Sequence, residues 1–321
     1  MPLAPASNPK GISCRFCVNN CQIDEGEISY CGLRINVERR LVGPSSKEAN
    51  LSWYFDQLPT NCVADWICPA GTGCGFPNFS FAPGPEYGFK NLAVFFNGCS
   101  FNCLFCQNWH FRLNLSQKKM VSAEELASSV DSHTACICYF GGDPSCQISY
   151  AIAASKLALK YKKNKILRIC WETNGSMNTE FLDQMLELSL QSGGCIKFDL
   201  KAFSEEVNIA LCGISNQKTK ENFAKLAQVV DKRPTPPLLI ASTLLVPGYV
   251  DEYEIENLAD FIAELNPDIP YSLLAFYPSF YLNDLPTTSR KHALTCKEKA
   301  ESSGLRNVHI GNVHLLSNTY G

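Results

Sequence analysis

From residue 91 onward, short apolar runs alternate with longer amphipathic stretches, and this alternation limits the folds open to the chain. Strands buried on both faces of a parallel sheet read as such continuous apolar runs, and they are expected at residues 92–96, 135–140, 166–171, 195–200, 238–246 and 271–276. Helical periodicity follows at 150–161, 179–190, 219–230, 255–265 and 289–302. A further helix opens at Ser122-Ala123-Glu124-Glu125, a capping box. Repeated strand–helix units predict an α/β fold, either an open Rossmann-like sheet or a partial barrel.

Residues 1–88 differ in character from the rest. They are rich in cysteine, proline and glycine and show little helical periodicity, as in Cys68-Pro69-Ala70-Gly71-Thr72-Gly73-Cys74. A segment with few periodic apolar positions does not easily bury a core of its own, so a bound metal would help to hold it. We therefore predict an irregular, cysteine-rich, metal-binding extension over residues 1–88 and a core domain over residues 89–321.

The bulk properties exclude several classes of protein. A net charge of −3 provides no basic field for nucleic acid and no polybasic patch for a membrane surface. The first residues lack the charged and apolar regions of a secretory signal, and no apolar run reaches the ~20 residues of a membrane helix. We expect a cytoplasmic protein that binds neither nucleic acid nor membrane.

The 17 cysteines are many for such a chain. In a reducing compartment, clustered cysteines indicate metal ligands rather than a disulfide framework. The isolated ones lie in apolar, strand-like runs, where free cysteine usually packs as a small core residue; they are Cys136, Cys138, Cys170 and Cys195.

Three cysteines follow the first predicted strand with the spacing C-x3-C-x2-C: Cys99, Cys103 and Cys106. Soft thiolate ligands suit iron–sulfur chemistry, and three of them can hold three irons of a cubane cluster. The fourth iron would keep an open position for substrate chemistry. The alternatives for this motif by itself are a zinc knuckle or chance clustering.

Polar motifs follow the next three predicted strands, at the sheet edge where parallel α/β folds place their functional loops. Phe140-Gly141-Gly142-Asp143-Pro144 combines glycines, which let a backbone approach a ligand closely, with a negative charge. Trp171-Glu172-Thr173-Asn174-Gly175 and Phe198-Asp199-Leu200-Lys201 supply a cluster of hard oxygen ligands and a lysine that can pair with a carboxylate. The alternative is that these motifs are ordinary turns at strand ends.

These motifs, in this order, resemble those of the radical S-adenosylmethionine (SAM) enzymes over about residues 91–321. Together with Leu245-Val246-Pro247-Gly248-Tyr249 and Phe276-Tyr277-Pro278, they are similar to the branch of the pyruvate formate-lyase activating enzymes. The resemblance implies a partial (β/α)6 barrel with a 4Fe–4S cluster that reductively cleaves SAM to methionine and a 5′-deoxyadenosyl radical. That radical would abstract a hydrogen atom from a substrate, for which a protein glycine is one candidate.

The resemblance also assigns roles to residues. Cys99, Cys103 and Cys106 would ligate the catalytic cluster. The SAM-binding residues would be Phe105, Gly141, Gly142, Asp143, Glu172, Thr173, Asn174, Asp199 and Lys201. Glu172, Thr173, Asp199 and Lys201 would organise the carboxylate side of SAM, where some members hold a monovalent cation. Glu172 stands where aspartate is usual, and a low-potential flavodoxin or ferredoxin would supply the electron.

A second group of cysteines precedes the core: Cys14, Cys17, Cys21 and Cys31. Four thiolates within eighteen residues suit tetrahedral zinc or a fully ligated iron–sulfur cluster. The pattern resembles the radical SAM proteins of the AmmeMemoRadiSam type, which leaves the metal open. Cys62, Cys68 and Cys74 either add a ligand or pack.

The histidines are weaker candidates for functional residues, because a lone histidine is usually a structural residue. His309 and His314 are candidates for the substrate face, and His110, with Trp109, for the surroundings of the cluster.

Two alternatives to glycyl-radical activation remain open. One is radical modification of a peptide or small metabolite. The other is a non-catalytic iron–sulfur electron carrier or zinc-binding protein, which would carry a fully ligated cluster and would not depend on SAM.

Overall fold

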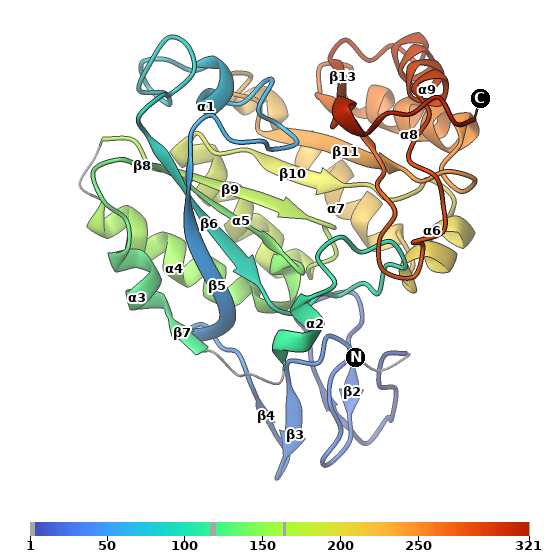
Figure 1. Ribbon diagram of the computed structural model, residues 1–321. Coiled ribbons are helices and arrows are strands. Elements are labelled where there is room, and N and C mark those ends of the chain that lie inside the picture. The colour runs from blue at the N-terminus through green and yellow to red at the C-terminus, as the bar shows by residue number, and fades with distance from the viewer. Residues whose placement is uncertain (1–3, 116–119, 163–164, 321) are drawn as a thin grey trace.

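The computed structural model describes residues 4–115, 120–162 and 165–320 (Figure 1). Its centre is a nine-stranded sheet with the strand order β13-β12-β11-β10-β9-β8-β6-β5-β7. The strands are β5 (Glu48–Gln57), β6 (Lys90–Phe96), β7 (Met120–Ser122), β8 (Thr134–Gly141), β9 (Arg168–Thr173), β10 (Ile196–Asp199), β11 (Leu239–Leu245), β12 (Tyr271–Ala275) and β13 (Val308–Gly311). β6 and β8 to β13 run parallel, while β5 is antiparallel to both β6 and β7.

The strand order decides between the two predicted architectures. From β6 to β13 the parallel strands follow one another in chain order without reversal. Right-handed crossovers then place all connecting helices on one face of the sheet, whereas a Rossmann-like sheet reverses its order and carries helices on both faces. The sheet is therefore a partial barrel, and the predicted α/β fold is confirmed.

The helices are α1 (Pro69–Thr72), α2 (Phe111–Asn114), α3 (Ala123–Ser128), α4 (Ile148–Tyr161), α5 (Thr179–Ser192), α6 (Glu205–Cys212), α7 (Gln217–Ala227), α8 (Glu252–Leu265) and α9 (Arg290–Ser302). Short 3₁₀ helices lie at η2 (Pro144–Gln147), η3 (Val230–Lys232) and η4 (Val313–Leu315). The predicted cap of α3 is present, because the Ser122 hydroxyl accepts a hydrogen bond from the backbone N–H of Glu125 at 3.0 Å. Sequence periodicity did not indicate α6, whose eight residues offer little more than two turns.

Alternation along the strands separates two different faces. One face is apolar and packs on the helices: Trp171 donates from Nε1 to Ser189 on α5, and Tyr139 accepts from Ser155 on α4. The opposite face, formed by the residues one position away, carries cysteines and charged groups on β8, β9 and β10. Because successive side chains of a strand point to opposite faces, one set builds the core and the other lines the barrel interior.

β5 was not expected, because residues 1–88 showed little regular pattern. It is ten residues long, and its residues 51–57 pair with β6 in the register Leu51↔Phe96 and Tyr54↔Ala93. The N-terminal segment thus adds a long strand to the same sheet as the core. The division of the chain at residue 88 stays a prediction.

Residues 58–74, here named the covering segment, lead from the end of β5 across the barrel interior. Trp66 on this segment donates from Nε1 to the Ser272 hydroxyl on β12 at 2.9 Å and stacks on His309 of β13 with ring centroids 4.9 Å apart. The Ser272 hydroxyl in turn donates to the carbonyl of Val63 at 2.7 Å. The covering segment therefore reaches from the β5 side of the sheet to its β13 edge.

The remaining N-terminal residues form two small hairpins, β1 (Ile12–Ser13) with β2 (Gln22–Ile23) and β3 (Ile35–Val37) with β4 (Arg40–Val42). They lie beside α2, at the end of the molecule opposite α1 (Figure 1). Asn19 donates to the carbonyl of Ser100 at 2.8 Å, and the backbone N–H of Val18 donates to the carbonyl of Ser176 at 2.8 Å. The hairpins are thus attached directly to the loop that carries the predicted cluster ligands.

Candidate active site

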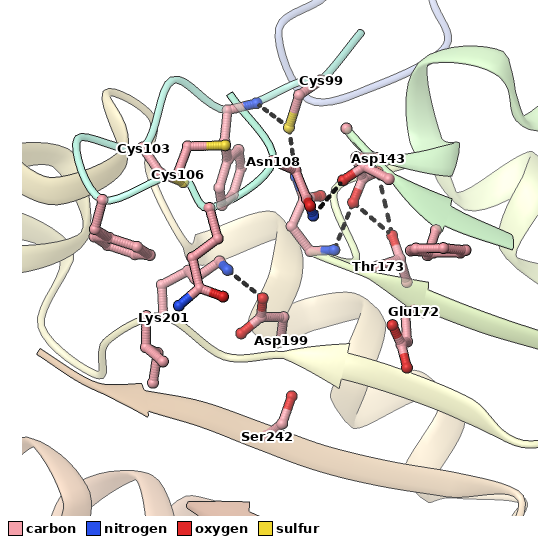
Figure 2. A pocket seen from close by; sticks show the side chains of 18 of the residues that line it. Cys99, Cys103, Cys106, Asn108, Asp143, Glu172, Thr173, Asp199, Lys201 and Ser242 are labelled. Atoms are coloured by element: carbon pink, nitrogen blue, oxygen red, sulfur yellow. Dashed lines mark hydrogen bonds and ion pairs between the residues drawn. The ribbon is translucent and has the colours of Figure 1, made fainter. Parts of the chain in front are cut away.

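The three predicted cluster ligands lie in one loop after β6. Cys99, Cys103 and Cys106 line a single cavity of about 200 Å³. The loop is hydrogen-bonded to the end of α6. The backbone N–H groups of Asn102 and Leu104 donate to the carbonyls of Cys212 and Leu211, both at 2.9 Å. Figure 2 shows the three thiols gathered at one end of the cavity.

The Gly141-Gly142 turn after β8 is joined to this loop by backbone hydrogen bonds. Gly142 donates to the carbonyl of Phe96 at 2.8 Å, and Asp143 donates to the carbonyl of Gly98 at 2.9 Å. A Cβ added at Gly142 would lie 2.2 Å from the Gly98 carbonyl oxygen. Because Gly142 has no side chain, this turn can approach the loop that carries Cys99, Cys103 and Cys106, here named the cluster loop.

Asp143 is buried and organises the ends of two strands. Its carboxylate accepts from the backbone N–H of Ser145 at 2.7 Å, from the backbone N–H of Asn174 at 2.7 Å and from the Thr173 hydroxyl at 3.1 Å. Asn174 extends the network to the cluster loop by donating to the Ser100 hydroxyl at 2.8 Å (Figure 2 shows the part around Asp143). Burial raises the pKa of Asp143, and the hydrogen bonds that it accepts oppose that rise.

The motif that ends β10 places an ion pair in the same cavity. The Lys201 ammonium pairs with the Asp199 carboxylate and lies over the Phe105 ring, 5.5 Å from its centroid. Burial works against the charged form of Lys201, but the neighbouring Asp199 carboxylate outweighs it, and the pKa of Lys201 is raised. Lys201 therefore stays charged at neutral pH.

Glu172 lies apart from the Asp143 network. Its carboxyl points away from Asp143 (Figure 2) and pairs with the Lys197 ammonium at 3.0 Å. Burial alone would raise the pKa of Glu172, but Lys197 lowers it below its usual value. Sequence analysis missed Lys197, although its spacing of two from Asp199 on β10 could have indicated a shared face.

A second cavity of about 120 Å³ adjoins the first. Phe140, Glu172 and Lys197 line both cavities. The second cavity, here named the thiol chamber, lies between the barrel interior and the covering segment. Six cysteines line it: Cys62, Cys68, Cys136, Cys138, Cys170 and Cys195.

The isolated strand cysteines are thus buried or half-buried, as predicted, but they also line a cavity. Cys62 and Cys68 face the same chamber from the covering segment, whereas Cys74 donates from its thiol to the carbonyl of Ile67 at 3.0 Å.

The four N-terminal cysteines are buried, and a fifth joins them. Cys17 and Cys31 pack with Cys146 of η2, three residues beyond Asp143. Cys146 was not predicted, because nothing in its local sequence sets it apart from a core cysteine. In the part of the chain that the structure describes, no group of three or more His, Cys, Asp or Glu side chains is placed to hold a single metal ion.

The histidine candidates do not join the first cavity. His309 stacks on Trp66 at the β13 edge, and burial lowers its pKa. His110 stacks on Trp109 with ring centroids 3.8 Å apart, and neither of them is among the described residues that line the cavity. His314 lies exposed in η4.

The residues of the first cavity fit a 4Fe–4S cluster and SAM. Three soft ligands from one loop share a cavity with a backbone turn, a buried carboxylate network and a lysine. Burial raises the pKa of Cys106 to about 11, so loading of iron must displace a proton from this thiol.

The fold and this cavity define the class of protein. Residues 93–262, more than half of the chain, match the model of the radical SAM superfamily, and the chain belongs to that superfamily. It is therefore a radical SAM enzyme with activating-enzyme-like relatives.

The relatives are similar to the chain at low identity. An uncharacterized protein of Methanocaldococcus jannaschii is 24% identical over 96% of this chain and 84% of that protein. The pyruvate formate-lyase 1-activating enzyme of Escherichia coli K12 is 28% identical over 57% of this chain and 73% of that enzyme. A radical SAM methyltransferase from Sphaerobacter thermophilus shares the fold, with a TM-score of 0.51 and 12% identity over 69% of this chain and 66% of that one.

No helix in the described part of the chain combines the length and apolarity that crossing a bilayer requires.

Proposed function

We propose that this enzyme abstracts a hydrogen atom from a substrate bound beside its SAM cavity. The observation that carries the proposal is the shared cavity: the three loop cysteines and the polar ends of β8, β9 and β10 line the same space. The cluster and SAM would supply, when bound, reductive cleavage of a carbon–sulfur bond and a radical that abstracts hydrogen. The electron would come from a low-potential flavodoxin or ferredoxin in a reducing, cytoplasmic setting.

The chain's own residues would bind and orient SAM. Cys99, Cys103 and Cys106 would hold the cluster, and the backbone of Gly141 and Gly142 would lie along the amino end of SAM. Asp143 would act mainly by fixing Thr173 and Asn174, because its carboxylate already accepts hydrogen bonds from both residues. Lys201 would meet the SAM carboxylate, since its ammonium faces the cavity beside Phe105.

The substrate would lie in or at the mouth of the thiol chamber, because that chamber adjoins the SAM cavity through Glu172 and Lys197. A protein glycine is the first candidate. It is supported by the similarity to the E. coli activating enzyme, whose name states that it acts on pyruvate formate-lyase. In that case a glycine-bearing loop of the partner would have to displace or pass the covering segment.

A peptide or small metabolite is the second candidate, and the covering segment favours it. Trp66 anchors that segment to β12 and β13, so the chamber is covered on the side from which a folded partner would approach. A small substrate would need no such displacement.

The decisive experiment is anaerobic reconstitution with iron and sulfide, followed by SAM and dithionite. We expect 5′-deoxyadenosine from the native protein and none from Cys103→Ala; equal release from both would overturn the proposal. The substrate candidates are then separated by electron paramagnetic resonance with a glycyl-radical enzyme as partner. Absence of a glycyl signal while 5′-deoxyadenosine still forms would rule out that partner class and leave the small substrate.

We further propose that the N-terminal cysteines bind a second metal centre, zinc or iron–sulfur. Cys146 belongs to this proposal, because its thiol contacts those of Cys17 and Cys31. Elemental analysis of the reconstituted protein tests it against Cys17→Ser and Cys146→Ser, with the buried Cys296→Ser of α9 as a matched control. Loss of the same metal from the first two variants alone is expected; identical metal content in all of them would contradict it.

A further inference from the structure

Lys197 is a buried ammonium at the junction of the two cavities. It lies on β10, its side chain is 5% exposed, and its register partner on β9 is Glu172. The Lys197 Nζ atom lies 3.0 Å from Glu172 Oε1, 3.2 Å from Cys62 Sγ and 3.2 Å from Cys138 Sγ. These partners come from β9, the covering segment and β8.

The three contacts satisfy this ammonium completely. A lysine ammonium has three N–H donors and no acceptor, and each donor finds one partner here. The Cys62 thiol closes the network by donating to Glu172 Oε1 at 3.2 Å. A charge buried this deeply is tolerated only when it is paired and hydrogen-bonded, and Lys197 meets both conditions.

The carboxylates expected to hold a monovalent cation are both already neutralised. Glu172 pairs with Lys197, and Asp199 pairs with Lys201. A further cation at Glu172 would meet a carboxylate whose charge is balanced, and it would be repelled by the Lys197 ammonium. The donor set of this chain therefore does not fit an additional monovalent cation.

We propose that the Lys197 ammonium takes the place of a monovalent cation beside the SAM cavity and positions Glu172 there. This inference rests on the proposed SAM site. A lysine ammonium carries the same single charge as potassium in a compact head, and its tether removes the entropy cost of binding a free ion. Lys197 is a positioning residue, because it acts through Glu172 and the adjoining Thr173–Asn174 end of β9.

The test is SAM binding by anaerobic calorimetry to the reconstituted protein, in potassium, sodium or choline chloride at equal ionic strength. We expect the native protein to bind SAM with the same affinity in all three salts. Lys197→Met keeps the length of the side chain and removes its charge. We expect this variant to bind SAM about tenfold more weakly in choline chloride and to regain affinity in potassium or ammonium chloride.

Lys90→Met is the matched control, because Lys90 also pairs with a carboxylate, Asp131, but on β6 away from the cavity. Its SAM affinity should be unchanged and insensitive to potassium. A second measurement uses the cluster-free proteins: potassium should raise the midpoint of thermal unfolding of Lys197→Met and leave the native protein and Lys90→Met unaffected.

The salt dependence of SAM binding separates the inference from the proposed function. Tighter SAM binding by the native protein in potassium than in choline would overturn the inference while leaving the proposed function intact, and this comparison needs no variant to fold. Unweakened binding by Lys197→Met in choline would overturn the positioning role. No SAM binding by the native protein in any salt would overturn the proposed function itself.

Discussion

Arg168 and Glu86 form a buried, bidentate ion pair within the barrel. The two side chains are 1% and 0% exposed, and Arg168 Nη1 donates to Glu86 Oε1 at 2.8 Å while Nη2 pairs with Oε2. Glu86 also accepts from the Ser80 hydroxyl at 3.0 Å and the Phe81 backbone at 2.8 Å. The pair thus ties the N-terminal segment to β9, and removal of one partner would leave the other charge buried and unpaired.

We predict that Glu86→Gln destabilises the protein by about 3–5 kcal/mol, the usual cost of breaking a buried pair on one side. The measurement is urea unfolding. Asp268→Asn serves as the control, because Asp268 pairs with Arg306 at an exposed position. We expect this substitution to lower the free energy of unfolding by less than ~1 kcal/mol. Equal destabilisation in the two variants would contradict the prediction.

The same pair predicts a dependence on pH. Burial alone would raise the pKa of Glu86, but its bonds with Arg168 lower it below the unfolded value. A lowered folded pKa means that the stabilisation is complete above the unfolded value of about 4.3 and is lost as the pH falls through the folded value. Native protein should therefore lose stability in acid more steeply than Glu86→Gln, as followed by urea unfolding at several pH values.

At the scale of elements, the turn from β8 into η2 joins the cluster loop to the strand ends that we propose bind SAM. We predict that Gly142→Ala lowers the iron content and SAM affinity of the reconstituted protein, because its Cβ would collide with the Gly98 carbonyl oxygen at 2.2 Å. Gly84→Ala is the control, since an added Cβ there meets nothing within 4 Å. Equal iron content and SAM binding in both variants would show that the turn can move.

The covering segment is the second element whose position can be tested. We predict that Trp66→Ala loosens the covering segment over β12 and β13 and exposes the thiols beneath, because it removes one of the bonds to Ser272 and the stack on His309. Mass spectrometry after brief alkylation should then detect faster labelling of Cys62 and Cys68 than in the native protein. Cys296, a buried residue of α9, is the internal reference, and its labelling should not change.

At the scale of the whole molecule, the cluster loop joins the N-terminal hairpins to the barrel through Asn19 and Ser100. A ligand that binds only the folded state stabilises it. We therefore predict that removal of iron lowers the midpoint of thermal unfolding and speeds proteolysis within residues 4–45, as resolved on gels. With zinc at the N-terminal cysteines, Cys103→Ala should behave as iron-free protein whether or not iron is supplied; a response of this variant to iron would place a stabilising iron centre outside the loop of Cys103.

The predicted strands and helices are present because their signals are local. An amphipathic period and a cap such as Ser122 act over a few residues, so the chain itself displays them. The grouping of the candidate site residues could be predicted for the same reason: the cysteine spacing, the glycine turn and the polar strand ends follow one another along the chain, and the parallel sheet brings them to one edge. Their roles stay predictions.

What the chain displays by itself is therefore the period of each element and the order of its motifs, and these determined the superfamily and the cluster loop. Only the tertiary structure decided which residues meet across elements. Strand register brings Lys197 against Glu172, the path of residues 58–74 brings Cys62 onto both, and packing of η2 brings Cys146 beside Cys17 and Cys31. The physical reason is that alternation fixes the face on which a side chain lies, whereas its neighbours on that face depend on contacts between distant residues, such as Cys62 and Lys197, which are 135 positions apart.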